Sequence, residues 1–370
     1  MTAAAPAVQL PLLEVLARLL VAAVPAAAAA FALDYMCARK GLLPPGFRIR
    51  WRRALAFVLV AGMLWIGIFR PLGELGLELQ LDLRSISTPQ LFLLHILMLL
   101  TVLGWLLLGF YALGAGAGRA GAAAPVSPPD APPPSGAPGA PGAPGAEAST
   151  PPPAPPVAAS PLMADLASAA TSAPPPAPVS PPLPFPSRAA SFLRQVAVQL
   201  GFRAPSVWLE IGLGLVLGIA AWLVVLAALL ALAAALWALG GEDALPKRPS
   251  AIVPWIAALP VLVRVAVSLS AGFVEEVFFR GFLQPRVGIA LSTLMFVLAH
   301  LSYGQPMMLV GITLLSLIYA LLVQWRQTVW PAIVAHFVFD GVQLLVMIPL
   351  ALRFLGPAGG GHASLLGLFF

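Results

Sequence analysis

Charged residues are scarce in this sequence: Asp, Glu, Lys and Arg make up 9% of its 370 residues, whereas hydrophobic residues make up 60%. Soluble globular domains carry about 25% charged residues, so this chain lacks the polar residues needed to cover a water-exposed surface. The composition excludes a soluble enzyme, a fibrous protein and a wholly disordered chain. The single cysteine, Cys37, excludes an intrachain disulfide and a cysteine-rich metal cluster. The net charge of +6 is interpreted as basic inside loops of a membrane protein, and no nucleic-acid partner is expected.

Long apolar runs are abundant. A run of about 20 apolar residues is long enough to cross the hydrocarbon core of a bilayer as a helix. A signal peptide is the alternative for the first run, but no basic segment precedes it and the run is long, so it is interpreted as a span. We therefore predict an all-α polytopic membrane protein of about eight transmembrane helices, at residues 12–33, 54–70, 91–115, 208–238, 260–283, 287–303, 307–324 and 329–351.

Residues 116–187 differ in kind, because more than half of the chain's 40 prolines fall there, together with repeated Gly-Ala-Pro. Such a segment cannot bury a core, which predicts a disordered, partly polyproline-II linker; a Pro-rich ligand for a partner domain is the alternative. The segment from Arg188 to Arg203 is typical of a short amphipathic helix on the membrane surface. The predicted parts are a three-helix membrane region at 1–115, the linker at 116–187, a five-helix membrane region at 188–353 and a Gly-containing hydrophobic tail at 354–370.

Lysine and arginine predict the orientation, because inside loops of membrane proteins carry an excess of them. With the N-terminus outside, twelve of these residues fall on the inside and five on the outside, a bias that depends strongly on the loop 34–53. This orientation puts the Pro-rich linker in the cytoplasm. The Ala-, Gly-, Pro- and Arg-rich composition is typical of a GC-rich bacterial genome, so we expect a multi-pass protein of the cell inner membrane.

Ionisable residues inside the apolar runs are few, and an intramembrane acid or base is a functional hypothesis by default. His95 stands alone in the third run and is interpreted as a packing residue. The fifth run contains adjacent Glu275 and Glu276, and Glu276 shares a helix face with Arg280, four positions later. Glu275 points about 100° away from that face, so it needs a different partner.

Two later runs supply polar partners. The sequence at 284–286 interrupts the apolar pattern, and a turn near 287–288 would bring His300 to about the depth of the glutamates. In the last run His336 and Asp340 share one helix face through their i, i+4 spacing. Counting 1.5 Å per residue from the inside turns puts His300 about 20 Å deep and His336 about 8–10 Å deep, so they meet only if the last helix is shifted or tilted. We expect these side chains and the glutamates to form one functional cluster.

Glutamate, histidine and aspartate in an apolar setting suit peptide hydrolysis. A water held between Glu275 and His300 could be deprotonated and attack an amide, while His336 beside Asp340 donates to the developing oxyanion. The alternative is a Zn²⁺ ion bound by Glu275, His300 and His336, which would activate the same water. The sequence leaves both readings open. It lacks a His-Glu-x-x-His motif, a second aspartate deep in an apolar run and a Gly-x-Ser-Gly elbow.

At these residues the chain resembles the CAAX-processing and bacteriocin-processing (CPBP) family. The resemblance covers about residues 205–350, and the third motif more often ends in Asn in the family. The three matching motifs are Glu275-Glu276-x-x-x-Arg280, Phe296-x-x-x-His300 and His336-x-x-x-Asp340.

The resemblance implies an eight-span intramembrane endopeptidase, described in the family both as a metalloprotease and as an enzyme with a glutamate-activated water. It implies that Glu275 is the principal base, that His300 holds the water, and that His336 and Asp340 form the oxyanion side. An ionised Asp340 can only accept hydrogen bonds, unlike the Asn more common there.

The same resemblance implies supporting roles for Glu276, Arg280 and Phe296. The prenylated substrate that the family name suggests is not carried over, because bacteria do not generally make CAAX proteins. The expected partners are the lipid bilayer and a membrane-associated protein or peptide as substrate. A non-catalytic immunity or scaffold protein and a proton-coupled transporter are the alternative functions.

Overall fold

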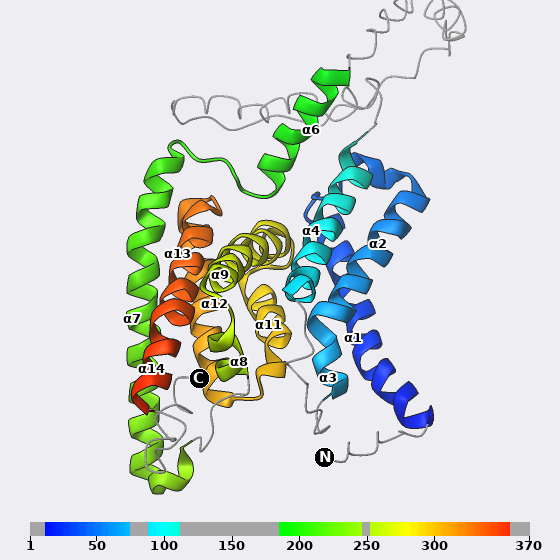
Figure 1. The fold of residues 1–370 in the computed structure, drawn as a ribbon. Helices are drawn as coiled ribbons and strands as arrows, with labels where there is room; N and C mark the ends of the chain where they lie inside the picture. Colours follow the sequence, from blue (N-terminus) through cyan, green and yellow to red (C-terminus); the bar gives the residue numbers. More distant parts are fainter. Residues whose placement is uncertain (1–11, 75–87, 112–184, 246–251, 356–370) are drawn as a thin grey trace, which may run out of the picture. The chain divides into compact units, whose positions relative to one another are not determined.

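The computed structural model describes residues 12–74, 88–111, 185–245 and 252–355, and every regular element in these ranges is helical (Figure 1). The α-helices are α1 (Leu12–Arg39), α2 (Arg50–Leu64), α3 (Arg70–Glu74), α4 (Thr88–Phe110), α6 (Phe185–Gln199), α7 (Val207–Gly240), α8 (Ile252–Ala258), α9 (Val261–Glu275), α10 (Gln284–Val287), α11 (Ile289–Ala299), α12 (Pro306–Arg326), α13 (Trp330–Gly341) and α14 (Ile348–Leu355). The π-helical segments are η2 (Trp65–Phe69), η5 (Glu276–Leu283) and η7 (Val342–Met347). The short 3₁₀ segments are η1 (Pro45–Arg48), η4 (Gly241–Ala244) and η6 (Leu301–Tyr303).

Six helical stretches of the described chain are long and apolar enough to cross a membrane, which makes this an all-α, multi-pass membrane protein. These stretches are Leu16–Arg39, Arg50–Leu72, Pro89–Phe110, Val207–Gly240, Pro306–Arg326 and Trp330–Arg353.

The fifth and sixth of the eight predicted runs differ from these six stretches. The fifth run is helical without a break from α9 through η5 to α10, but it carries several charged side chains. The sixth run is helical only over Ile289–Tyr303. At 1.5 Å per residue this stretch is about 22 Å long, shorter than the hydrocarbon core of about 30 Å.

The expected linker lies almost entirely outside the described residues, as does the tail from residue 356. Only the last three residues of the expected linker, 185–187, are described. They are helical, because α6 begins at Phe185 rather than at 188. The Phe192 ring of α6 packs edge-on against Tyr111, just after α4, with centroids 5.6 Å apart. The described helices before and after the linker belong to one compact unit, formed by residues 1–113 and 184–370.

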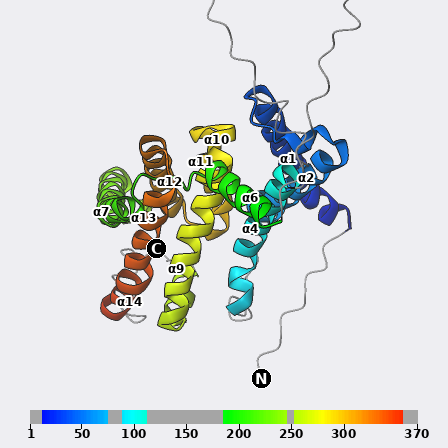
Figure 2. The ribbon, with the colours of Figure 1, turned by 90° about the horizontal axis from the view of Figure 1, so that it is seen from above.

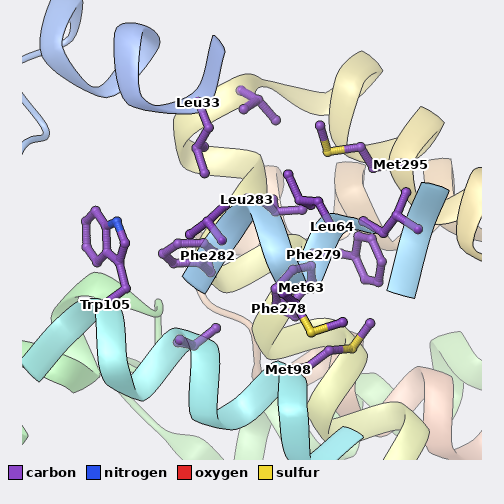
Figure 3. Packing of buried hydrophobic residues seen from close by; sticks show 14 of the residues in the cluster. Leu33, Met63, Leu64, Met98, Trp105, Phe278, Phe279, Phe282, Leu283 and Met295 are labelled. Carbon is purple, nitrogen blue, oxygen red and sulfur yellow. The ribbon is translucent and has the colours of Figure 1, made fainter. Parts of the chain in front are cut away.

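The N-terminal helices pack against the π-helical segment η5. Figure 3 shows Met98 and Trp105 of α4 beside aromatic residues of η5. The rings of Trp105 and Phe282 meet edge-on at 5.2 Å between centroids, and Phe282 is completely buried. Close packing of this kind, rather than exclusion from water, holds helices together in a membrane.

A hydrogen bond from the N-terminal helices caps the helix at the end of the fifth run. Lys40, just after α1, donates from Nζ to the carbonyl oxygen of Arg286 at 2.8 Å. Carbonyl groups in the last turn of a helix have no intrahelical donor, so this bond satisfies one of them. The chain then reverses at Gly288, whose φ of +86° is costly for residues with a side chain. The turn expected near 287–288 is therefore present, and α11, which follows it, packs against η5 and α10.

Helix α9 runs across α7 instead of alongside it. Figure 1 views α9 nearly along its axis and α7 lengthwise, and Figure 2, turned by 90°, views them the other way round. At Gly272 α9 touches α13, where an added Cβ would lie 2.8 Å from the Phe337 backbone nitrogen. A small residue is required at position 272, because the nearest atoms belong to the backbone of α13 and cannot rotate away. This close contact brings the polar end of α9 against α13.

Candidate functional site

Glu275 and Glu276 lie where α9 changes into the π-helical segment η5. Glu275 is the last residue of α9 and Glu276 the first of η5, which also contains Arg280. A π-helix widens the turn and is frequent at functional sites. Ser292 of α11 donates to the carbonyl oxygen of Phe279 inside η5 at 2.8 Å, which supports this irregular backbone.

Glu276 is fully enclosed between two basic partners. Its Oε1 lies 3.0 Å from Nη1 of Arg280 and 2.8 Å from Nδ1 of His336, and none of its side chain is exposed. Arg280 in turn donates from Nη2 to Oγ of Ser316 at 3.1 Å, and its guanidinium lies 4.3 Å from the ring centroid of Phe296. Glu276 therefore makes the pair with Arg280 that the i, i+4 spacing predicts, and a contact with His336 that the spacing does not predict.

Both ring nitrogens of His336 face carboxylates. Nδ1 lies 2.8 Å from Glu276, and Nε2 lies 3.6 Å from Oδ2 of Asp340, its expected neighbour on α13. The ring of Tyr319 stacks on His336 at 5.1 Å between centroids, which limits rotation of the imidazole. Because an ionised carboxylate only accepts hydrogen bonds, the contact with Glu276 requires a proton on Nδ1 of His336.

Glu275 faces His300, the residue that follows α11. Nε2 of His300 lies 4.0 Å from Oε2 of Glu275, too far for a direct hydrogen bond. Nδ1 of His300 is 2.7 Å from the carbonyl oxygen of Phe296, and a carbonyl can only accept, so Nδ1 carries a proton. In a neutral His300 the nitrogen that faces Glu275 is therefore an acceptor.

The two histidines lie close together, because both pack on the ring of Phe296. The centroid of that ring lies 4.6 Å from His300 and 6.3 Å from His336. The depth difference obtained by counting residues assumed helices parallel to the membrane normal. Since α9 runs across α7, that assumption fails, and residue counting could not predict how close the two histidines lie.

A cavity of about 710 Å³ adjoins these residues, with walls that are mostly aliphatic and aromatic. Its polar wall includes Glu275, His300, Tyr303, His336 and Asp340. Glu276 is sealed behind this wall with 0% exposure, whereas the side chain of Glu275 is 14% exposed. The two adjacent glutamates thus have different surroundings, and Glu275 is the one that a molecule in the cavity can reach.

His95 of α4 also lines this cavity, although its isolation in the sequence predicts only a packing role. Its Nε2 lies 3.4 Å from Oε1 of Glu275, and its Nδ1 lies 2.7 Å from Oγ of Ser270. No local spacing rule could have found these contacts, because about 180 residues separate the partners. The one signal in the sequence is that His95 is a basic residue within an otherwise apolar run.

The zinc set that the sequence left open does not fit this geometry. His336 directs both ring nitrogens at carboxylates, Nδ1 at Glu276 and Nε2 at Asp340. Within the described ranges, no group of three or more His, Cys, Asp or Glu side chains has an arrangement that could hold a metal ion. Glu275, His300 and His336 line one cavity, but they do not converge as ligands.

Comparison with known proteins gives two matches. The profile of the family named Type II CAAX prenyl endopeptidase Rce1-like matches residues 257–342, a range that contains all three motifs. Uncharacterized protein YpbD of Bacillus subtilis (strain 168) is 29% identical over 79 residues, which are 21% of this chain and 42% of that protein. No solved structure matches the chain. From the profile and the three motifs together, the chain carries, over residues 257–342, a domain of the Rce1-like type II CAAX prenyl endopeptidase (CPBP) family.

Proposed function

We propose that this protein is an intramembrane endopeptidase that hydrolyses a peptide bond of a membrane-associated protein or peptide with a water activated by Glu275 and His300. The observation that carries the proposal is the 4.0 Å gap between Oε2 of Glu275 and Nε2 of His300 at the wall of the 710 Å³ cavity. A gap of this size lets one water hydrogen-bond to both atoms. The family domain supports the same reaction class.

The water would be oriented by two acceptors. Because neutral His300 carries its proton on Nδ1, its Nε2 accepts a hydrogen bond from the water, and the carboxylate of Glu275 accepts a second one. Both hydrogens then point at the protein, and a lone pair of the oxygen points into the cavity. This is the geometry that a general base needs to deliver hydroxide to a carbonyl carbon.

The reaction then balances with the residues present. The water oxygen bonds to the carbonyl carbon as its proton passes to Glu275, which gives a tetrahedral oxyanion. With protons on both ring nitrogens, His336 donates from Nδ1 to Glu276 and from Nε2 to that oxyanion. Glu275 returns its proton to the amide nitrogen as the C–N bond breaks, which leaves a carboxylic acid and an amine.

Glu276, Arg280 and Asp340 support this arrangement. Glu276 fixes the protonated nitrogen of His336, and Arg280 supplies the counter-charge for Glu276. Asp340 flanks the other nitrogen of His336 at 3.6 Å, where its negative charge favours a protonated ring. The ring of Phe296 packs against the imidazole of His300 and against the guanidinium of Arg280.

The cavity lining indicates the chemical class of substrate. Most lining side chains are Leu, Val, Ile, Met, Phe and Trp, so an apolar peptide segment from a membrane-embedded chain suits it. For location we propose the cell inner membrane, with the Pro-rich linker in the cytoplasm. That orientation follows from the lysine and arginine bias of the loops.

The test uses the purified full chain in liposomes with two probes, fluorescein-labelled casein and a panel of single-span reporter proteins. The wild-type chain should cleave at least one probe, and Glu275→Gln should lower the rate by about 100-fold or more without lowering the melting temperature. Glu210→Gln is the matched control. Glu210 is a buried glutamate, 1% exposed, that pairs with Arg326 and lies outside the cavity lining, so its loss should spare cleavage.

Two outcomes would overturn the proposal. Equal cleavage by the wild-type chain and Glu275→Gln would remove Glu275 from the reaction. No cleavage of any probe, together with proton uptake into the liposomes that Glu275→Gln abolishes, would favour a transporter.

A further inference from the structure

His95 brings a second polar contact to Glu275 from outside the family domain. It lies on α4, whereas the family profile begins at residue 257. Its ring nitrogens lie 2.7 Å from Oγ of Ser270 and 3.4 Å from Oε1 of Glu275. Both partners belong to α9, so this imidazole joins α4 to the helix that carries Glu275.

The chemistry of the partners fixes the direction of these hydrogen bonds. An ionised Glu275 only accepts, so Nε2 of His95 must be the donor in that contact. In a neutral ring Nδ1 is then an acceptor, and the Ser270 hydroxyl donates a hydrogen bond to it. In a protonated ring the Ser270 oxygen accepts instead. Nε2 of His95 donates to Glu275 in both cases.

The consequence concerns the orientation of the carboxylate. His95 contacts Oε1 of Glu275, and His300 faces Oε2. A carboxylate held at one oxygen cannot turn freely about its last side-chain bond, so its other oxygen stays directed at the water position. The side chains of His95 and Glu275 are each 14% exposed, so little solvent competes for the bond.

We propose that His95 is a positioning residue that holds Glu275 for its role as general base, with Ser270 holding His95 in turn. This inference rests on the proposed endopeptidase function. It also means that α4 completes the active site, so the N-terminal helices are more than a membrane anchor.

The kinetic test compares kcat and KM for the probe that the wild-type chain cleaves. His95→Leu should lower kcat by about 10- to 100-fold with little change in KM, because a misplaced base slows chemistry without weakening binding. His95→Gln should recover much of kcat, because its amide keeps an N–H donor. Leu91→Ala is the matched control one turn earlier on the same face of α4; it lines the cavity and should raise KM instead.

A double-variant cycle tests the role of Ser270. Ser270→Ala should cause a smaller loss of kcat than His95→Leu and no further loss in the His95→Leu background, since it acts only through His95. Additive losses of kcat in the double variant would show that Ser270 does not act through His95. Unchanged kcat in His95→Leu, with Glu275→Gln inactive, would overturn the positioning role while leaving the proposed function intact.

A spectroscopic test needs no substrate. The chain has only four histidines, so ¹⁵N NMR of the ring-labelled full chain in nanodiscs can be assigned from the His95→Gln variant. The Nε2 resonance of His95 should be of the N–H type and should move in Glu275→Gln, and its Nδ1 resonance should move in Ser270→Ala. Glu210→Gln should move neither. Identical His95 resonances in the wild type and Glu275→Gln would overturn the inference, whatever the cleavage assay gives.

Discussion

Glu276 Oε1 lies 2.8 Å from Nδ1 of His336, a contact across 60 residues of sequence. The same oxygen lies 3.0 Å from Arg280, so one buried carboxylate serves two basic groups on different helices. The contact with Arg280 is local and follows from spacing on one helix. The contact with His336 joins η5 to α13, and it fixes which nitrogen of His336 carries the proton beside Glu276.

Replacing Glu276 alone and replacing it together with Arg280 should therefore have different effects on stability but similar effects on activity. Glu276→Gln leaves Arg280 buried without its counter-charge, which should destabilise the fold by about 3–5 kcal/mol. Replacing both, as Glu276→Leu with Arg280→Met, should recover part of the melting temperature because no unpaired charge remains. Cleavage should stay low in the double variant, because Nδ1 of His336 then lacks its acceptor. A double variant that regained full cleavage would show that Glu276 acts only as a counter-ion.

Asp340 tests what His336 needs at its second nitrogen. Asp340→Asn should keep cleavage within about threefold of wild type, because Asn can accept from His336 or donate to the oxyanion. Asp340→Leu, which has the same branching but no polar atoms, should lose about 10- to 100-fold. Both rates are measured on the same probe with protein level as the control. If Asn is as damaging as Leu, the negative charge of Asp340 itself is required.

Metal removal separates the two mechanisms that the sequence left open. Because both ring nitrogens of His336 face carboxylates, we expect zinc well below one atom per purified chain. A strong chelator should leave the cleavage rate unchanged. The measurements are metal content by mass spectrometry and rate before and after chelation. Stoichiometric zinc, with activity lost on stripping and restored on readdition, would contradict this expectation.

Gly272 tests how closely α9 and α13 must approach. A Cβ at this position would lie 2.8 Å from the backbone nitrogen of Phe337 and 2.9 Å from the carbonyl oxygen of Ile333, atoms that cannot rotate away. Gly272→Ala should therefore destabilise the fold by about 1–3 kcal/mol. It should also lower cleavage, because the added methyl group pushes α13, which carries His336, away from Glu276.

The control for that variant is Gly212→Ala on α7, where an added Cβ meets nothing within 4 Å. Its melting temperature should be unchanged or slightly higher, because Ala is favoured over Gly in a helix by up to about 1 kcal/mol. Equal melting temperatures for the two variants would mean that the helices separate without cost at Gly272.

The sequence by itself determined the fold class, since apolar runs near 20 residues with few charges can fold only as membrane helices. It also determined the three motifs, the pairing of Glu276 with Arg280 and the turn at Gly288. The motifs and the pair depend on spacing within one helix, and the turn was predicted from the interruption of the apolar pattern at 284–286. Local rules therefore sufficed.

The tertiary structure alone decided the surroundings of each glutamate. The enclosure of Glu276, the exposure of Glu275 to the cavity and the contact with His95 depend on how α4, α9 and α13 pack, and side chains from distant segments meet there. The proximity of His300 and His336 was likewise beyond residue counting, because counting assumes parallel helices and α9 runs across α7 (Figures 1 and 2). The spacing of residues along one helix determines which of them share a face. The packing of helices against each other determines which residues that face contacts.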